Sequence, residues 1–359
     1  MRHWFAANRS KLIHALRMTI SCLAAFALAA ALALPQAFWA VITAIIVTQS
    51  SVGGSLKAAL DRFVGSLLGV VYGCAVAILM PHGDPPARAL ALLVAVAPLS
   101  FFAAISAGLR VAPITAIIVL LGTSGASLGP LGFATDRVLE VGLGCVVGVL
   151  VSVLVVPARA SRSVLVTAAE VARLLARQLD ALAADGSAAE GNTDGKGQAD
   201  MNALALRTRK ALTRLETLVG EAARERRSRL ADLPDPDPLL RTLMRLRHDV
   251  VMLRRAVWEP SRNGAPEWSW APVAAAAAAR LGSLADALAA GLLPAPSDAL
   301  AGALADYRTA IDGMRKAHRT RDLPTDMLWR LFGAGFALEQ ASRNLADLEE
   351  RVADFAARP

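Results

Sequence analysis

The sequence has little charge for its length. Asp, Glu, Lys and Arg make up 19% of its 359 residues, against about 25% in an average soluble domain. Hydrophobic residues make up 55%, and the mean hydropathy is +0.45. This composition argues against an ordinary soluble protein and indicates a membrane protein with a soluble part.

Cysteine is also scarce, and its placement excludes two kinds of site. Cys22, Cys74 and Cys145 each lie inside an apolar run, and none is near a histidine or another cysteine. This pattern fits neither a disulfide framework nor a cysteine-ligated metal. The five histidines are scattered without metal-ligand spacing. We therefore expect no metal and no other cofactor.

The motifs of common enzyme classes are missing. There is no Walker A loop, no dinucleotide-binding glycine motif after a strand and no HExxH. No Lys/Arg cluster is interleaved with aromatic residues, so the formal net charge of +8 does not indicate nucleic acid. We expect a protein that is not an enzyme. Without an ATP site, any pumping would have to be driven by an ion gradient.

The charges that are present lie unevenly along the chain. Residues 1–157 hold 9 of the 38 Lys and Arg and 4 of the 30 Asp and Glu. We expect a transmembrane domain at 1–157 and a cytosolic α-helical domain at 158–359, with a flexible loop at 185–200. A spanning helix needs about 20 apolar residues. The apolar runs predict six spans, near 16–34, 38–55, 62–80, 89–108, 112–129 and 137–156.

The basic residues near the span ends predict the orientation. One side of the membrane would receive Arg2, Arg9, Lys11, Arg17, Lys57, Arg62, Arg110, Arg159 and Arg162, and the other only Arg88 and Arg137. Cytoplasmic loops carry the excess of Lys and Arg. Both termini and the C-terminal domain are therefore predicted to be cytoplasmic.

An internal repeat predicts how the membrane domain is built. The hexapeptide ITAIIV occurs at 42–47 and again at 114–119. The landmarks after the first copy match those after the second, with Asp61, Arg62, Gly69 and Gly73 corresponding to Asp136, Arg137, Gly144 and Gly148. Each repeat of about 75 residues holds three spans, so the second enters the membrane from the opposite side.

Such an inverted repeat is typical of secondary transporters, whose substrate sites lie near mid-membrane at the repeat interface. The predicted fold class is therefore all-α: a six-helix transmembrane bundle built as an inverted three-helix repeat, followed by a cytosolic helical bundle.

Charged and hydroxyl side chains in the spans are the candidates for a substrate path. They are Arg62, Arg137, Glu140, Asp61, Asp136, Gln49, Thr43 and Thr115. Glu140 either forms an interfacial salt bridge with Arg137 or titrates in a cavity. The Ser, Thr and Gly residues after each ITAIIV predict either a broken helix or ordinary hydroxyl bonding to helix carbonyls.

Glycines at four-residue spacing are predicted to pack helices closely. They are Gly65, Gly69 and Gly73 on the third span, and Gly144 and Gly148 on the sixth.

Two segments resemble the fusaric acid resistance and aromatic acid exporter family. The first is FWAVITAIIVTQSSVGGSLKAALDRFVGSLLG at 38–69, with R-x-x-G-[ST]-x-x-G at Arg62, Gly65, Ser66 and Gly69. The second is RVLEVGLGCVVGVLVSVLVVP at 137–157. The resemblance implies efflux of small, often aromatic, carboxylic acids across the bacterial inner membrane. Longer exporters of this kind carry two such modules, so a single module implies a homodimer.

The expected function is thus proton-gradient-driven efflux of a small organic anion, with the lipid bilayer and a second copy as the other partners. Two alternatives stay open at this point. One is a dimeric anion channel, similar to the plant malate channels in its six spans and helical cytosolic domain. The other is a non-transporting membrane scaffold whose large cytosolic bundle binds a partner.

Overall fold

The computed structural model describes residues 2–80, 84–122, 129–155, 160–187, 195–228, 234–257, 269–321 and 323–356. Within these ranges every regular element is a helix, which confirms the all-α class. The chain divides into two compact units, Met1–Arg159 and Ala160–Pro359. Each unit is described by itself.

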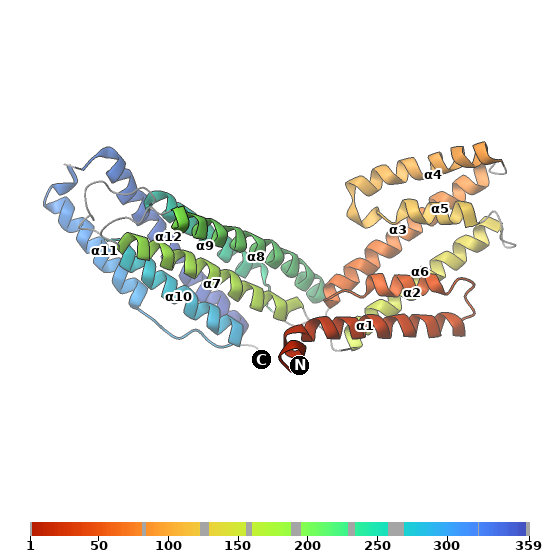
Figure 1. Cartoon of the computed structure of the whole chain (residues 1–359), viewed down its shortest axis with the longest axis horizontal. Coiled ribbons are helices and arrows are strands. Elements are labelled where there is room, and N and C mark those ends of the chain that lie inside the picture. The colour runs from red at the N-terminus through yellow and green to blue at the C-terminus, as the bar shows by residue number, and fades with distance from the viewer. Residues whose placement is uncertain are drawn as a thin grey trace. The chain divides into compact units, whose positions relative to one another are not determined.

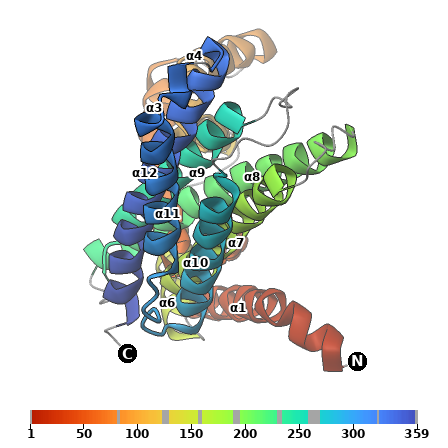
Figure 2. The same ribbon diagram turned by 90° about the vertical axis from the view of Figure 1, so that its left-hand side faces the viewer.

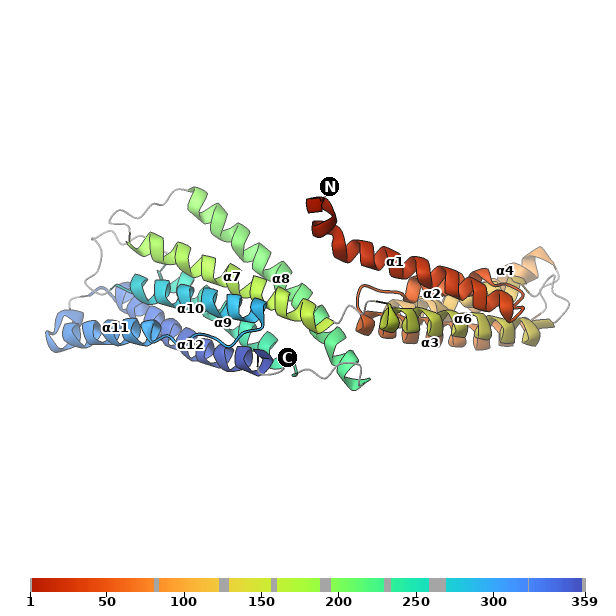
Figure 3. The same ribbon diagram turned by 90° about the horizontal axis from the view of Figure 1, so that it is seen from below.

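The first unit is a bundle of helices that run in alternate directions (Figure 1). Helices α3 and α6 pack against each other (Figure 3), while α2 packs on α6 and α5 packs on α3. The bounds are α1 Arg2–Ala31, α2 Phe38–Val47, α3 Val52–Leu79, α4 Pro85–Ile105, the 3-10 turn η1 Ala107–Leu109, α5 Ala112–Gly122 and α6 Gly129–Leu154.

Local sequence sets several of these helix ends. Ser51 caps α3, because its Oγ accepts a hydrogen bond from the backbone N–H of Gly54 at 3.0 Å. Helix α4 starts with proline in its first turn, where a missing N–H costs nothing. After α1 the chain turns at Ala33, which has a positive φ of 51°.

Four helices of this unit are long and apolar enough to cross a membrane: Lys11–Ala31, Val52–Leu79, Pro85–Ile105 and Leu131–Leu154. The span expected at 38–55 is shorter than predicted, since α2 has 10 residues, and the described part of the span expected at 112–129 is the 11-residue helix α5. Each is about 15 Å long, half the thickness of the hydrocarbon layer. The chain leaves the helix after Val47. The second expected break, at Thr123, Ser124 and Ser127, lies outside the described residues.

The side chains of this unit are distributed as in a protein surrounded by lipid. Small residues fill its interior, and Ala40, Ala44, Ala112 and Ala116 are fully buried. Large apolar side chains lie outside, with exposed fractions of 59% for Phe26, 62% for Leu23, 65% for Phe101 and 70% for Ile105. Lipid solvates large apolar groups, so small residues are left to bring the helices together.

Glycines allow the closest helix contacts. A Cβ atom on Gly69 would lie 2.3 Å from the carbonyl oxygen of Ala112, and one on Gly144 would lie 2.5 Å from that of Ala40. A Cβ atom on Gly73 or on Gly148 would likewise overlap atoms of the neighbouring helix. The contact of α3 with α5 therefore has a counterpart in the contact of α6 with α2, at positions that the sequence repeat relates.

The second unit is a bundle of longer amphipathic helices. Figure 1 and Figure 2 show α7 beside α10 and α9 beside α12, the pairs with the most extensive contact. Its core is rich in buried leucine. The bounds are α7 Ala160–Ser187, α8 Gly195–Arg227, α9 Asp237–Val257, α10 Ala271–Ala290, α11 Ala299–Lys316, the 3-10 turn η3 Arg319–Arg321 and α12 Thr325–Ala356.

Two features of this unit qualify the expectations. The loop predicted at 185–200 is helical at both ends, since α7 continues to Ser187 and α8 begins at Gly195. Residues 188–194 lie outside the described residues. Helix α10 is also apolar enough to cross a membrane by length and composition. It nevertheless holds the buried Arg280, which pairs with Glu349 of α12 at 2.5 Å.

We predict that Gly144→Ala destabilises the membrane unit, whereas Gly142→Ala does not. The new methyl group at 144 would overlap backbone and the Cβ of Thr43, at a cost of about 1–3 kcal/mol. The nearest atom to a methyl group at 142 is a ring carbon of Phe63 at 3.6 Å, an ordinary contact. Thermal unfolding of the purified protein in detergent measures both variants. Equal melting temperatures for the two would refute the packing role.

Candidate functional site

Two arginines lie buried where α3 meets α6. Arg62 of α3 is 8% exposed and Arg137 of α6 is 2% exposed. They occupy equivalent positions in the two repeats and are close enough to interact electrostatically. The Nε atoms of both arginines and Nη1 of Arg137 are buried without a hydrogen-bond partner. Buried cations of this kind are costly in a membrane and mark functional sites.

Glu140 supplies one negative charge to this site. It is 1% exposed, and its Oε2 lies 3.9 Å from Nη1 of Arg137. Its Oε1 accepts a hydrogen bond from the backbone N–H of Gln36 at 2.9 Å, which ties α6 to the turn before α2. Arg62 has no ion pair or hydrogen bond within the described residues. Two guanidinium groups and one carboxylate therefore leave the cluster with a formal charge of +1.

The ring of Trp39 in α2 stacks against the guanidinium group of Arg137. The guanidinium carbon lies 3.7 Å from the centroid of the ring, a cation–π contact. The indole Nε1 donates to the side-chain oxygen of Gln36 at 3.0 Å, so the ring is held in place. Trp39 was not a candidate from the sequence, because its partner Arg137 lies 98 positions away and no motif links the two residues.

Buried threonine and serine residues lie on or against the helices that carry the charged residues. Thr43 is fully buried against Gly144, and its Oγ1 has no hydrogen-bond partner. Ser66 is 3% exposed, and its Oγ is likewise without a partner. Thr115 contacts Gly69 in the equivalent place, but its hydroxyl donates to the carbonyl of Val111 at 3.1 Å. The two related threonines thus differ, since only Thr43 keeps an unused hydroxyl.

Three of the predicted candidates lie at the edge of this cluster or away from it. Asp61 is half-buried and faces η1, where its Oδ1 lies 2.9 Å from the position of a Cβ on Gly108. Asp136 is half-buried and near enough to Glu140 to interact electrostatically. Gln49 is exposed, and its side-chain amide donates to the carbonyl of Ile46 near the end of α2.

The cluster is not symmetric between the repeats. The offset of 75 that relates Gly69 to Gly144 makes Gly65 the counterpart of Glu140. Gly65 lies against the backbone of Gly108 and carries no charge. The only carboxylate that contacts an arginine of the cluster in the described residues therefore comes from the second repeat.

This arrangement suits a small anion. Arginine presents planar N–H donors that match a carboxylate in a bidentate manner. The described residues contain no group of His, Cys, Asp and Glu side chains that could hold a metal ion. We therefore identify the candidate site as Arg62, Arg137, Glu140, Trp39, Thr43 and Ser66, hereafter the arginine cluster.

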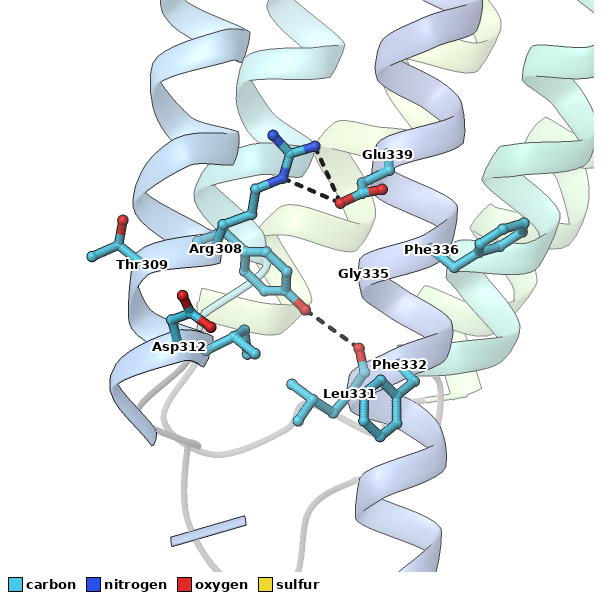
Figure 4. Close-up of a pocket in the computed structure, with 10 residues that line it drawn as sticks. Arg308, Thr309, Asp312, Leu331, Phe332, Gly335, Phe336 and Glu339 are labelled. Carbon is cyan, nitrogen blue, oxygen red and sulfur yellow. Dashed lines mark hydrogen bonds and ion pairs between the residues drawn. The ribbon is translucent and has the colours of Figure 1, made fainter. Parts of the chain in front are cut away.

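Two pockets of the second unit each contain a paired charge. Figure 4 shows the one between α11 and α12, where Arg308 pairs with Glu339 at 3.1 Å and the Tyr307 hydroxyl donates to the carbonyl of Leu331 at 3.4 Å. Burial raises the pKa of Tyr307 to about 12. The other lies between α9 and α12 beside Asp249, which accepts from Asn344 at 2.5 Å and whose pKa is raised by burial.

We predict that Glu140→Gln lowers the free energy of unfolding by about 3–5 kcal/mol, because it leaves Arg137 buried without a counter-charge. Adding Arg137→Gln should restore part of this loss, since the uncompensated charge is then gone. Asp347→Asn, which breaks the exposed pair with Arg245, is the control and should cost less than about 1 kcal/mol. Thermal unfolding in detergent measures all three. Additive losses for the 137 and 140 changes would contradict the pairing.

Comparison with known proteins shows what this chain is similar to. A segment of 68 residues, 19% of this chain, is 38% identical to a protein named "Uncharacterized transporter YdhK" from Escherichia coli K12, and equally to its counterpart in E. coli O157:H7. The matched segment covers 10% of the length of those relatives. The profile of the fusaric acid resistance protein family matches residues 11–358. This chain is a multi-pass membrane protein that belongs to the fusaric acid resistance protein family.

Proposed function

We propose that this protein exports small organic acids, and aromatic carboxylic acids in particular, across the inner membrane. The observation that carries the proposal is the arginine cluster, a buried site with a formal charge of +1 inside a membrane unit. One carboxylate would neutralise it. The unpartnered guanidinium N–H groups and the hydroxyls of Thr43 and Ser66 would supply its hydrogen bonds.

Trp39 supports the preference for aromatic acids. Its ring already lies over Arg137 at the cluster. An aromatic acid that places its carboxylate on the guanidinium groups brings its own ring close to this indole. Aromatic pairs gain about 0.5–1.5 kcal/mol beyond their area burial, enough to favour an aromatic acid over an aliphatic acid of the same charge.

We propose further that the membrane unit is an inverted repeat of α1–α3 and α4–α6. The matched glycine contacts of α3 with α5 and of α6 with α2 support it. So do the short helices α2 and α5, which occupy the same position in each half. In such transporters the site lies at the repeat interface, and here the two arginines of the cluster lie on α3 and α6, one helix from each half.

The proton-motive force would drive this export. An organic acid with a single negative charge that leaves the cytoplasm moves down the electrical part of that force. The inside-negative potential contributes about 2.3 kcal/mol per charge for every 100 mV. Because the membrane potential supplies this driving force, export does not require a nucleotide-binding site.

The remaining parts of the proposal rest on charge and on the family. The excess of basic residues on one side of the spans supports cytoplasmic termini. The ion pair of Arg280 with Glu349 supports placing the second unit, α10 included, in the cytosol. The homodimer stays a prediction that the family resemblance implies.

Transport by proteoliposomes tests the function. We predict that the wild-type protein moves labelled benzoate towards the positive side of an imposed potential. Arg62→Gln or Arg137→Gln should lower the rate roughly tenfold or more, because a hydrogen bond to a charged group contributes about 1.5–3 kcal/mol. Arg110→Gln removes an exposed arginine outside the cluster and should leave the rate within about twofold.

The same assay separates the alternatives. A carrier saturates with benzoate, whereas an anion channel would give single-channel steps in a planar bilayer that Arg62→Gln reduces. Equal flux in protein-containing and empty liposomes would refute transport of either kind and leave the scaffold as the explanation.

A further inference from the structure

A third buried arginine lies outside the arginine cluster. Arg17 of α1 is 1% exposed, although it lies only six residues from the start of the apolar span at Lys11. An arginine near a span end normally extends its side chain to the membrane surface. Arg17 instead turns inward, and its Nη2 donates to the carbonyl of Ser50 at 3.2 Å.

Most of this guanidinium group has nothing to bind. Its Nε and Nη1 are buried without a hydrogen-bond partner. Within the described residues no carboxylate pairs with Arg17. A single carbonyl satisfies one donor but does not balance the charge, so the group remains a buried cation without an anion.

The segment that Arg17 reaches is the break between α2 and α3. Residues 48–51 are non-helical, and α3 begins at Val52 with Ser51 as its cap. Helix α3 is 28 residues long, and the N-terminus of such a helix carries a partial positive charge that attracts anions. Arg17 and this helix terminus therefore favour a negative charge at the same place.

His14 adds a third polar group. It precedes Arg17 by three residues on α1, so the two side chains share a face of the helix. Its Nδ1 is also buried without a partner. Neither residue was a candidate in the sequence, where Arg17 counts only as one of the basic residues near the span ends.

We propose that Arg17, His14 and the start of α3 form a second anion-binding station for the carboxylate of the exported acid. It rests on the proposed function, in which it receives the acid before the arginine cluster does. Arg62 follows Val52 by ten residues, so the two positions are roughly 15 Å apart along α3.

Two stations are useful to a transporter of anions. A single deep site that binds an anion strongly also releases that anion slowly. Rapid passage is easier when the anion binds at several weaker sites in turn. An anion at the Arg17 station would repel the one at the cluster and promote its departure.

Cysteine modification tests the station without measuring transport. Ser50 is exposed, and Arg17 binds its backbone, so Ser50→Cys keeps the contact. In the full chain, with Cys22, Cys74 and Cys145 changed to alanine, the thiol is modified with a negatively charged and a positively charged methanethiosulfonate. We expect the ratio of the two rates, negative over positive, to fall roughly tenfold when Arg17→Gln is added. Benzoate should slow modification only while Arg17 is present.

Arg110→Gln in the same background is the matched control and should leave the ratio unchanged. A ratio that Arg17→Gln does not alter, or a thiol that neither reagent reaches, would overturn the station. The ratio of modification rates reports the local charge and not transport. Arg17→Gln can therefore lower the ratio even if benzoate is not transported, and it can leave the ratio unchanged while transport is intact.

Discussion

A guanidinium group removed from water needs hydrogen bonds and a counter-charge. The described residues of the membrane unit include three buried arginines that lack some of these partners. Arg17, Arg62 and Arg137 are each less than 10% exposed. Placing one arginine at the centre of a spanning helix costs about 2.5–3.5 kcal/mol on insertion scales. Among the described residues, Arg137 is the one of the three that is paired with a carboxylate. The close helix packing, the stack of Trp39 and the broken helix at 48–51 all serve to hold these charges where lipid cannot reach them.

The way the helices pack explains how such charges are tolerated. Glycine and alanine at the contacts of α3 with α5 and of α6 with α2 let the backbones approach within contact distance. Large side chains are displaced to the outside, where lipid solvates them. The carbonyl of Ser50 replaces part of the hydration of Arg17, and Glu140 and the ring of Trp39 do the same for Arg137. The second unit is built in the opposite way, with leucine inside and charged pairs on its surface.

Much of the fold could be predicted from the sequence, because helix periodicity and apolar length are local properties. The sequence predicted an α-helical domain at 158–359, and the described residues of this part form helices α7 to α12. The repeat located Arg62 and Arg137 as an equivalent pair. The break after Val47 agrees with the broken helix that the Ser, Thr and Gly residues after ITAIIV predicted as one of two alternatives, whereas the expected span at 38–55 ran through these residues, because apolar composition alone does not set where a helix ends. Trp39, Arg17 and His14 were missed for a different reason: their environment is created by residues distant in sequence.

Gly65 and Glu140 occupy related positions, and only one of them is ionisable. An inverted-repeat carrier changes its opening when its halves exchange shapes. In the inverted-repeat carrier that we propose, the exchange would be between unequal partners, since in the described residues one half brings a carboxylate to the arginines and the other brings none. The two openings would therefore differ in energy even with no substrate bound. Such a protein would rest facing one compartment, and its transport would be faster in one direction than in the other.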